Sequence, residues 1–413
     1  MEDNDERSAG PLAGVRVVDI TTVVMGPYAT VTLADLGADV IKIEGLDGDM
    51  TRGIGAYRHP GMSAMTLNLQ RNKRSVALDL GSAAGREVLD ALVRDADVLV
   101  TNLRPRSRAR LGITWERLGE LNPKLILCTS QAYGAETERR DEPAYDDIVQ
   151  AASGSARLSE LVDGVPRYAP NVIADKVAGL HIVNAVLAAV VHRNSTGTGQ
   201  WVDVPMVDVM IAFNLVEHFG GHTFSPAEGP FGWARVLVPE RMPHRTADGW
   251  ICIMPYSDAN WRDFFTLAGL TDMVDNPRYA KVRDRHAHMG ELLAAVGEVA
   301  VTKTTAQWLE LCSANQIPAA DLLDLATVHE DKYVLSQGLL TEREHPTEGR
   351  YFSGRTPVNL SATPVGFRRH APQLGQHTVE VLTEIGIAPE RIRELTDDGV
   401  IKSWSPDEGA RDD

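Results

Sequence analysis

The segment that most constrains the fold is a long apolar run over residues 177–191. Only His181 and Asn184 are strongly polar within it, and no proline interrupts it. A helix that is apolar on nearly all sides has to be packed on most of its circumference. The sequence therefore predicts a core helix that begins at Asp175 and is surrounded by the other elements of the domain.

Two interpretations of Asp175 follow from its place at this helix start. A carboxylate there can cap the helix by accepting hydrogen bonds from the first free backbone N–H groups. The helix dipole and the same N–H groups also favour the ionised form, which would make Asp175 an anionic nucleophile at neutral pH. The capping preference alone favours the structural interpretation, and the nucleophile stays open as the alternative.

Length and charge limit the classes of protein to consider. A chain of 413 residues that is 43% hydrophobic is long enough for two domains with sizeable cores, and it is typical of a soluble α/β protein. The net charge of −16 argues against a general nucleic-acid or anionic-membrane binder, whose surface would be basic. Any anionic ligand must therefore meet a local basic patch.

The cysteines and the N-terminus indicate a compartment. Three cysteines, an odd number and widely spaced, predict neither a disulfide framework nor a metal site, so a reducing compartment fits best. Residues 1–10 are acidic where a signal peptide would be basic and then apolar, and no apolar run reaches membrane-spanning length. We expect a disordered tail on a cytoplasmic protein that has no membrane partner.

The first part of the chain has the pattern of a parallel sheet covered by helices. Residues 15–20 form a predicted strand, Gly26 begins a helix that ends near Leu36, and a second strand over 38–43 is followed by Glu44. The turn lacks the G-x-G-x-x-G of a dinucleotide site, so an NAD site is not favoured. Further strands are expected at 75–80, 97–101, 125–129 and 201–204, and helices at 83–94, 145–152 and 208–218.

Two basic stretches, over residues 71–74 and 102–110, adjoin the predicted strands. In open parallel sheets ligands gather beyond the carboxyl ends of strands, and arginines there suit phosphate groups. Charge runs are also common on solvated surfaces, so from the residues alone both interpretations stay open.

The character of the chain changes at about residue 220, where the composition becomes that of a loop. A hairpin is predicted next, with strands over 244–246 and 250–254 around Ala247-Asp248-Gly249. Helices are expected at 258–270, 286–300, 304–315, 320–325 and 375–385 and from Pro389, and the segment from Ser153 to Asp175 is expected to be a polar loop.

Several motifs occur in the order that a known family shows. They are G-P-Y-A-T-V-T-L-A-D-L-G-A-D-V-I-K-I-E, G-D-M-T-R-G, N-K-R-S-V-A-L-D-L, A-D-V-L-V-T-N-L-R-P and G-T-G-Q-W-V-D-V-P-M. The chain resembles the class III CoA-transferases, which include formyl-CoA and carnitine CoA-transferases and the α-methylacyl-CoA racemases. The resemblance extends over nearly the whole chain. It implies a Rossmann-like large domain built from both chain ends, an inserted smaller α/β domain and a homodimer of two interlinked rings.

With this resemblance, the chain is divided into the following predicted parts: a disordered acidic tail (1–10), the large CoA-binding domain (11–219), a linker (220–235), the small α/β domain (236–325), a second linker (326–349) and a C-terminal segment that returns to the large domain (350–413).

The resemblance also implies the chemistry. It places the catalytic nucleophile at Asp175, which would form an aspartyl anhydride and then an aspartyl-CoA thioester as CoA passes from an acyl-CoA to a carboxylic acid. It implies no permanently bound cofactor and no metal. By position, the residues that would bind CoA are Asn72, Lys73, Arg74, Asn102 and Arg110, with Arg104 in addition. The phosphates of CoA would then explain a cationic cluster on an acidic protein.

Two alternatives are a racemase of the same family and a non-catalytic CoA-binding protein. In the racemases a histidine in a G-H-D motif exchanges the α-proton, but the matching run here is A-Y-D-D, with Tyr145 in the histidine's place. A tyrosine, of pKa about 10, is a poor base at pH 7, and the neighbouring Asp146 and Asp147 are expected to be helix caps. A glutamine that some transferases carry is replaced by Val24. Candidates for the acceptor carboxylate are Arg52, Arg167, Arg235 and Arg241.

Overall fold

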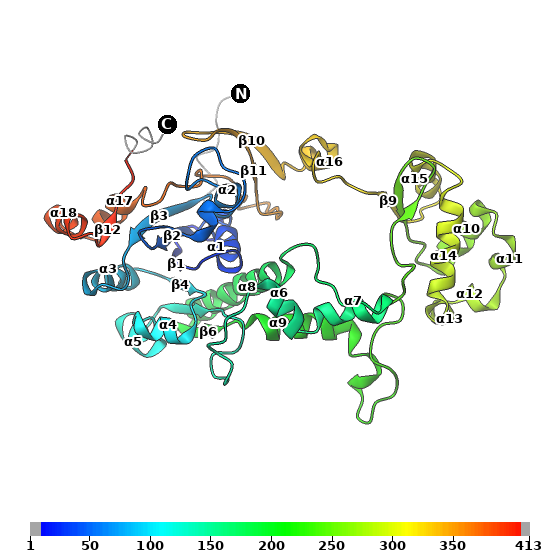
Figure 1. Cartoon of the computed structure of the whole chain (residues 1–413), viewed down its shortest axis with the longest axis horizontal. Helices are drawn as coiled ribbons and strands as arrows, with labels where there is room; N and C mark the ends of the chain where they lie inside the picture. The colour runs from blue at the N-terminus through cyan, green and yellow to red at the C-terminus, as the bar shows by residue number, and fades with distance from the viewer. Residues whose placement is uncertain (1–9, 406–413) are drawn as a thin grey trace. The chain divides into compact units, whose positions relative to one another are not determined.

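The computed structural model describes residues 10–405, and the chain divides into two compact units (Figure 1). The first unit comprises the chain up to Ser153, the segment Pro170–Met210 and the chain from His329 onward. The second comprises Gly154–Ala169 and Ile211–Val328. The predicted disordered tail, residues 1–10, lies outside the described residues apart from Gly10.

A mainly parallel sheet forms the centre of the first unit. Its strands run in the order β12-β3-β2-β1-β4-β5-β6, and only β12 is antiparallel to its neighbour. The strands are β1 (Arg16–Ile20), β2 (Asp39–Glu44), β3 (Lys73–Leu78), β4 (Val98–Thr101), β5 (Ile126–Thr129), β6 (Gln200–Asp203) and β12 (Ile401–Lys402). The order 3-2-1-4-5-6 is that of the doubly wound, Rossmann-like fold. The predicted α/β class with a parallel central sheet is confirmed.

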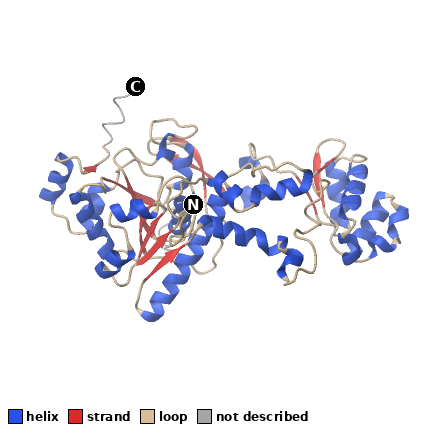
Figure 2. Cartoon of the chain, turned by 60° about the horizontal axis from the view of Figure 1, so that its bottom comes forward, coloured by secondary structure: helices blue, strands red, loops and turns tan. Residues whose placement is uncertain are grey.

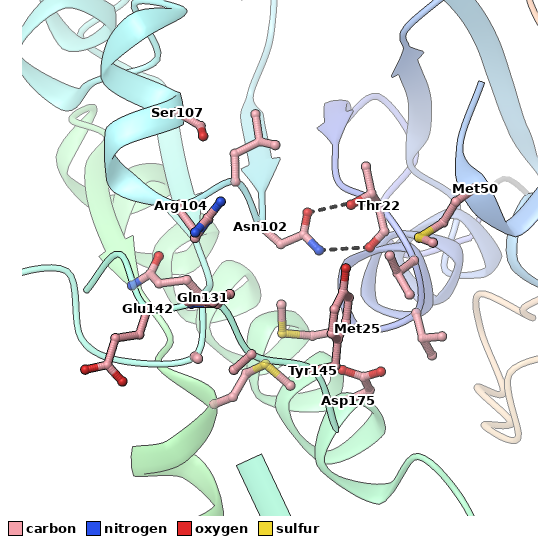
Figure 3. A pocket seen from close by; sticks show the side chains of 17 residues that line it. Thr22, Met25, Met50, Asn102, Arg104, Ser107, Gln131, Glu142, Tyr145 and Asp175 are labelled. Carbon is pink, nitrogen blue, oxygen red and sulfur yellow. Dashed lines mark hydrogen bonds between the residues drawn. The ribbon is translucent and has the colours of Figure 1, made fainter. Parts of the chain in front are cut away.

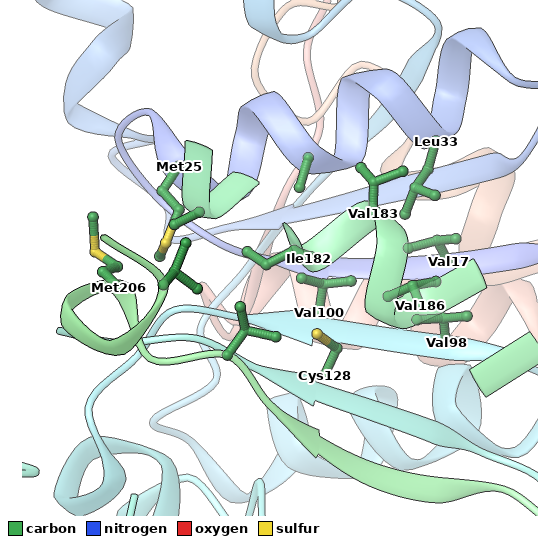
Figure 4. Packing of buried hydrophobic residues seen from close by; sticks show 14 of the residues in the cluster. Val17, Met25, Leu33, Val98, Val100, Cys128, Ile182, Val183, Val186 and Met206 are labelled. Atoms are coloured by element: carbon green, nitrogen blue, oxygen red, sulfur yellow. The ribbon is translucent and has the colours of Figure 1, made fainter. Parts of the chain in front are cut away.

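Alternate residues of each strand face opposite sides of the sheet, and each side has its own core. Val17 packs with α1 (Met25–Asp35) and α8 (Ile173–Thr196) on one side, whereas Val18 faces the other side. Figure 4 shows the first of these cores, and Figure 2 shows helices on both sides of the strands. The other helices of this unit are α2 (Ala64–Leu69), α3 (Ala83–Arg94), α4 (Pro105–Arg110), α5 (Trp115–Leu121), α6 (Asp146–Ala152), α16 (Lys332–Ser336), α17 (Thr378–Glu384) and α18 (Pro389–Asp397).

Helix α8 is the predicted core helix. Its buried residues pack against α1 and the sheet, and at Gly179 an added Cβ would lie 2.9 Å from the carbonyl oxygen of Met25. The close approach of α1 and α8 therefore requires a glycine at this position. By length and composition α8 is apolar enough to cross a membrane, with a mean hydropathy of 1.6 over its most apolar window, so the expectation that no run reaches that length was wrong. Its hydrophobicity is explained by packing inside the unit.

Helix α9 (Met206–His218) leads from β6 into the second unit, which has its own core and its own sheet. The antiparallel strands β7 (His244–Arg245), β8 (Trp250–Ile253) and β9 (Ala319–Asp321) form the sheet, and Trp261, Phe264 and Trp308 lie in the core. The helices of this unit are α7 (Ser155–Asp163), α10 (Asp258–Ala268), α11 (Thr271–Val274), α12 (Pro277–Ala280), α13 (Val282–His286), α14 (Met289–Ala300) and α15 (Thr305–Ala314). The predicted hairpin is present as β7 and β8.

Two predicted elements were wrong, and one hairpin was not predicted. The expected polar loop before Asp175 contains α7, a short helix with no buried residue, whose few apolar residues lie in a mainly polar stretch. The expected helix at 320–325 is absent from these described residues: strand β9 already occupies Ala319–Asp321, and its pairing with β8 overrides the local helical spacing. The unpredicted hairpin is formed by β10 (Leu340–His345) and β11 (Gly349–Gly354). Short 3₁₀ segments are η2 (Met50–Gly53), η3 (Gly220–Thr223) and η4 (Val328–Glu330).

Candidate active site

A pocket of about 330 Å³ lies at the carboxyl edge of the sheet, between the loops that follow β1 and β4 (Figure 3). From β1 the chain builds the sheet in one direction, through β2 and β3, and it then returns to place β4 on the other side of β1. The strand order therefore reverses between β1 and β4, where the pocket lies. Ligands of doubly wound sheets bind at such a switch point. We call it the Asp175 pocket. Its lining residues are Thr22, Val23, Val24, Met25, Met50, Asn102, Leu103, Arg104, Ser107, Gln131, Ala132, Glu142, Pro143, Ala144, Tyr145, Asp175 and Met206.

The loop after β1 is held in a strained conformation at this pocket. Val23 has φ +68°, which is unusual for a β-branched residue. Its N–H group donates to the buried carboxylate of Asp49, with N–O distances of 3.2 and 3.3 Å. The amide of Asn102 exchanges two hydrogen bonds with the backbone of Thr22, at 2.9 and 2.8 Å (Figure 3). Asn102 thus lines the pocket as predicted, and its side chain fixes the loop that leads into α1.

The structure corrects the helix position of Asp175. Helix α8 begins at Ile173, and its N-cap is Val172, which makes no side-chain capping bond. Asp175 is the third residue of the first turn and does not cap the helix. The carboxylate of Asp146 caps this end of α8 instead, since one of its oxygens accepts from the backbone N–H of Asp175 at 2.9 Å. Its other oxygen accepts from the side-chain amide of Gln150 at 2.6 Å.

The protonation of Asp175 also differs from the expectation. Burial, together with the charge of Asp146, raises the pKa of Asp175 from 3.8 to about 7, against the opposing effect of Lys176. The helix dipole was expected to keep this group ionised, but desolvation and a second carboxylate outweigh it. Asp175 is therefore poised between its neutral and its ionised form near neutral pH, a property that is common among catalytic carboxyl groups.

A second pocket, of about 390 Å³, adjoins the first, since Arg104 and Ser107 line both. Arg106, Arg110 and Asp141 complete its lining, and we call it the arginine pocket. Asp141 accepts from Arg104 through its carbonyl oxygen and from the backbone N–H of Arg106 through its carboxylate. Within residues 10–405, no carboxylate forms an ion pair with the guanidinium group of Arg104, Arg106 or Arg110. The predicted residues Arg104 and Arg110 thus line one pocket, and that pocket adjoins the Asp175 pocket.

The other basic stretch lies elsewhere. Residues 71–74 lead into β3 at Lys73, so they occupy the amino edge of the sheet, whereas Asn102 and Arg104 follow the carboxyl end of β4. None of Asn72, Lys73 or Arg74 lines the Asp175 pocket or the arginine pocket. The two basic stretches are therefore not brought together.

The side chains of this stretch form internal contacts. Lys73 is fully buried, and its ammonium group lies 3.1 Å from the carboxylate of Asp19. Burial lowers the pKa of Lys73 to about 8 despite the charge of Asp19. Asn72, at φ +62°, donates to Asp35 at 2.9 Å and accepts from the backbone N–H groups of two arginines of the C-terminal segment.

Arg74 is held by three carboxylates. Its guanidinium group forks onto Asp39 at 3.0 and 2.6 Å and contacts Glu380 at 3.0 Å and Glu384 at 2.7 Å. Burial opposes the charged form, but these hydrogen bonds raise the pKa of Arg74 above its ordinary value. A role of Asn72, Lys73 and Arg74 in CoA binding stays a prediction, and these contacts weigh against it.

Two of the arginines that were predicted as possible ligands of the acceptor carboxylate also pair with acidic side chains of the chain. Arg52 is buried and forks onto Glu44 at 2.7 Å through two nitrogens. Arg167 pairs with Asp163 at 2.6 Å. Arg235 and Arg241 lie in the second unit.

Sequence reasoning missed several residues of the site. Gln131 follows β5 at the same edge of the sheet, so the rule that singled out the residues after β4 would have found it. Arg106 and Ser107 belong to the recognised basic stretch but were not selected from it. Asp146 was expected to be a cap, yet its contact with Asp175 spans 29 residues and leaves no local signal.

Comparison with known proteins decides the family. The model of "CoA-transferase family III" matches residues 12–378. The chain belongs to CoA-transferase family III. It is 32% identical to a succinate–glutarate CoA-transferase of Agrobacterium fabrum, over 91% of this chain and 96% of the relative. It is 33% identical to a formyl-CoA:oxalate CoA-transferase of Afipia carboxidovorans, over 91% and 94%.

Solved structures agree with this membership. The crystal structure of Rv3272 from M. tuberculosis superposes with a TM-score of 0.77 at 29% identity, covering 90% of this chain and 99% of that one. A CAIB/BAIF family protein from Brucella suis gives a TM-score of 0.75 at 27% identity, covering 91% and 100%. The resemblance drawn from the motifs is confirmed, and the chain is a CoA-transferase of this family with CoA thioesters as its substrate class.

Proposed function

We propose that this family III CoA-transferase moves CoA from an acyl-CoA to a carboxylic acid through covalent intermediates on Asp175. The observation that carries the proposal is that two pockets share a wall. One contains the partly buried carboxyl group of Asp175, and the other presents three arginines that have no carboxylate partner in the described part of the chain. An acyl-CoA has a thioester at one end and phosphates at the other. The arrangement offers a nucleophile to the first and forked donors to the second.

The reaction proceeds by four exchanges at carbonyl carbons. The Asp175 carboxylate attacks the donor thioester, which forms a mixed anhydride and releases the CoA thiolate. The thiolate attacks the aspartyl carbonyl, which forms aspartyl-CoA and releases the donor acid. The acceptor carboxylate attacks aspartyl-CoA, which forms a second anhydride and releases the CoA thiolate again. The thiolate then attacks the acceptor carbonyl, which forms the new acyl-CoA and frees the Asp175 carboxylate. Atoms and charge balance at each step, and the thioester is conserved as long as water is excluded.

We propose a short dicarboxylic acid as the acceptor. The names of the two relatives contain oxalate, succinate and glutarate, all of which are short dicarboxylic acids. The partly enclosed volume of about 330 Å³ suits the thioester end of CoA together with such an acid. Val24, which replaces the glutamine of some transferases, lines the pocket and makes its wall apolar at this point.

The racemase alternative is disfavoured by the lining of the Asp175 pocket. Among the described residues no histidine lines it, and Tyr145 is a solvent-exposed member of the lining. Asp146 is engaged with Asp175 and Gln150, so it is not free to act as a second proton acceptor on the far side of an α-carbon. A non-catalytic CoA-binding protein would not require a carboxyl group whose pKa lies near neutral pH.

The proposal includes an interlinked homodimer. Its support is the family resemblance together with large apolar side chains that are exposed on α9 of the single chain. Phe213 and Val216 are 49% and 85% exposed. Apolar residues gathered on one exposed helix are typical of a surface covered by a partner.

The covalent step is tested by trapping. The protein is incubated with succinyl-CoA or acetyl-CoA, treated with hydroxylamine and digested, and peptide mass spectrometry locates the hydroxamate. We expect the adduct on Asp175, and none in Asp175→Asn, whose CoA affinity should remain and shows that the variant is folded. Wild-type turnover by Asp175→Asn, or an adduct on another residue, would refute the mechanism.

A further inference from the structure

Arg108 is a buried cation that the proposed reaction does not use. It lies on α4 between the arginines of the arginine pocket, yet it lines neither that pocket nor the Asp175 pocket. The residue is only 6% exposed, and its Nε has no hydrogen-bond partner within the described part of the chain. Burial lowers the pKa of Arg108, against the attraction of Asp203 and Asp141. A buried guanidinium nitrogen without a hydrogen-bond partner is energetically costly, and a bound ligand would remove that cost.

Asp203, the acidic group whose charge most favours the ionised form of Arg108, does not supply that partner. One oxygen of the Asp203 carboxylate accepts from the hydroxyl of Thr129 at 2.8 Å and from the amide of Gln131 at 2.9 Å. The other accepts from the backbone N–H of Ala135 at 2.9 Å. Among residues 10–405 no carboxylate lies within ion-pair distance of the Arg108 guanidinium group. Asp203 thus attracts Arg108 at a distance but is bonded to other groups.

Arg108 opens onto a separate pocket of about 250 Å³ on the other side of α4. This pocket shares no lining residue with the Asp175 pocket or the arginine pocket. A second cation, the exposed Arg140, stands at its rim and is only loosely paired with Asp141, at 3.7 Å. The indoles of Trp115 and Trp201 form part of the wall, and Glu116 is an exposed acidic member of the lining.

We propose that this pocket binds a small oxyanion, either phosphate or a short carboxylic acid, with the Arg108 guanidinium group as its buried ligand. A guanidinium group presents forked donors that match the oxygens of both anions. Aromatic and aliphatic side chains also line the pocket, and low polarity around a hydrogen bond strengthens it. The volume is below that of sites for drug-sized ligands, so a nucleotide or CoA itself does not fit. The site is independent of the covalent reaction proposed for Asp175.

The test measures anion binding while the CoA site is filled. The full chain is saturated with CoA, in a buffer low in chloride, and titrated with sodium phosphate in one arm and sodium succinate in the other. Calorimetry and tryptophan fluorescence follow binding, because Trp115 and Trp201 line the pocket. We expect at least one anion to bind saturably in a manner that depends on Arg108, whereas succinate bound in the proposed acid site of the Asp175 pocket would not depend on it. The anion with the tighter Arg108-dependent binding identifies the class of ligand.

Variants locate the site. Arg108→Gln should weaken binding by roughly tenfold or more, as expected for a lost charge-assisted hydrogen bond. Arg140→Gln, at the exposed rim, should weaken it a few-fold and carries little risk to folding. Arg94→Gln, which removes one exposed arginine at the end of α3, is the matched control and should bind as the wild type does. Absence of saturable binding in the wild type, or equal weakening in all three variants, would show that Arg108 only balances the charge of Asp203.

Discussion

Replacing Asp146 with asparagine removes a charge beside Asp175 while keeping the shape of the side chain. The carboxylate of Asp146 accepts from the Asp175 N–H at 2.9 Å, and an asparagine oxygen can still accept there. Of the two causes that raise the pKa of Asp175 to about 7, burial comes first and the charge of Asp146 second. Asp146→Asn therefore abolishes the smaller cause and leaves the larger.

The size of the effect follows from Coulomb's law. At about 6 Å, the outer end of the range over which a neighbouring charge shifts a pKa, a like charge contributes ~3 kcal/mol at an effective dielectric constant of about 20. Partial exposure of Asp175 to solvent roughly halves this, and about 1.4 kcal/mol corresponds to one pK unit. We expect the pKa of Asp175 to fall by about one unit and to remain above its ordinary value.

The direction of the pH dependence is fixed by the chemistry. Only the ionised form of Asp175 attacks a thioester, so acylation should rise with pH through about 7 in the wild type. In Asp146→Asn this rise should move to lower pH by about one unit. The assay is the rate of enzyme acylation by succinyl-CoA between about pH 5 and 9, followed by intact-protein mass after a rapid quench.

Asp147→Asn is the matched control, because it removes the same charge from the exposed neighbouring residue, which makes no bond to Asp175. Its profile should stay that of the wild type. A profile of Asp146→Asn that does not move, or an equal shift in Asp147→Asn, would refute the reasoning that Asp146 sets the protonation of the nucleophile.

The remaining predictions concern binding, stability and assembly. Arg110→Gln should raise the KM for acyl-CoA about tenfold with kcat little changed. Arg74→Gln should instead lower the Tm and leave KM unchanged, since its guanidinium group already pairs with three carboxylates of the chain itself. A raised KM without a loss of stability in the second variant would make Arg74 a CoA contact after all. Phe264→Ala should destabilise the second unit by about 3–5 kcal/mol in urea unfolding, and a value under about 1 kcal/mol would contradict its place in the core. Sedimentation on dilution should show a dimer that does not dissociate to folded monomers, and reversible dissociation would exclude interlinked rings.

The elements that could be predicted are those whose local pattern agrees with their environment. Helix α3 has its apolar residues on one face and a capping serine at Ser82, and its predicted bounds of 83–94 agree with the structure. Helix α7 is short and has no buried residue; Leu158, Leu161 and Val162 have helical spacing, but they lie in a polar stretch and were not recognised as a helix face. Strand β9 is defined by its pairing with β8 more than 60 residues earlier in the chain. Local sequence reasoning fails where long-range contacts decide the conformation.

The candidate site shows the same limit more sharply. Both basic stretches adjoin strands of one parallel sheet, and their composition alone does not separate them. The direction of the chain separates the two stretches. Residues 102–110 follow β4 and lie at the carboxyl edge, where ligands bind, whereas residues 71–74 precede or begin β3 and lie at the opposite edge. The order of strand and charge along the chain therefore favours Arg104 and Arg110 over Arg74 as ligand-binding residues. The protonation of Asp175 had no comparable signal, because it depends on burial and on a carboxylate 29 residues away whose contact arises only when α6 and α8 pack together.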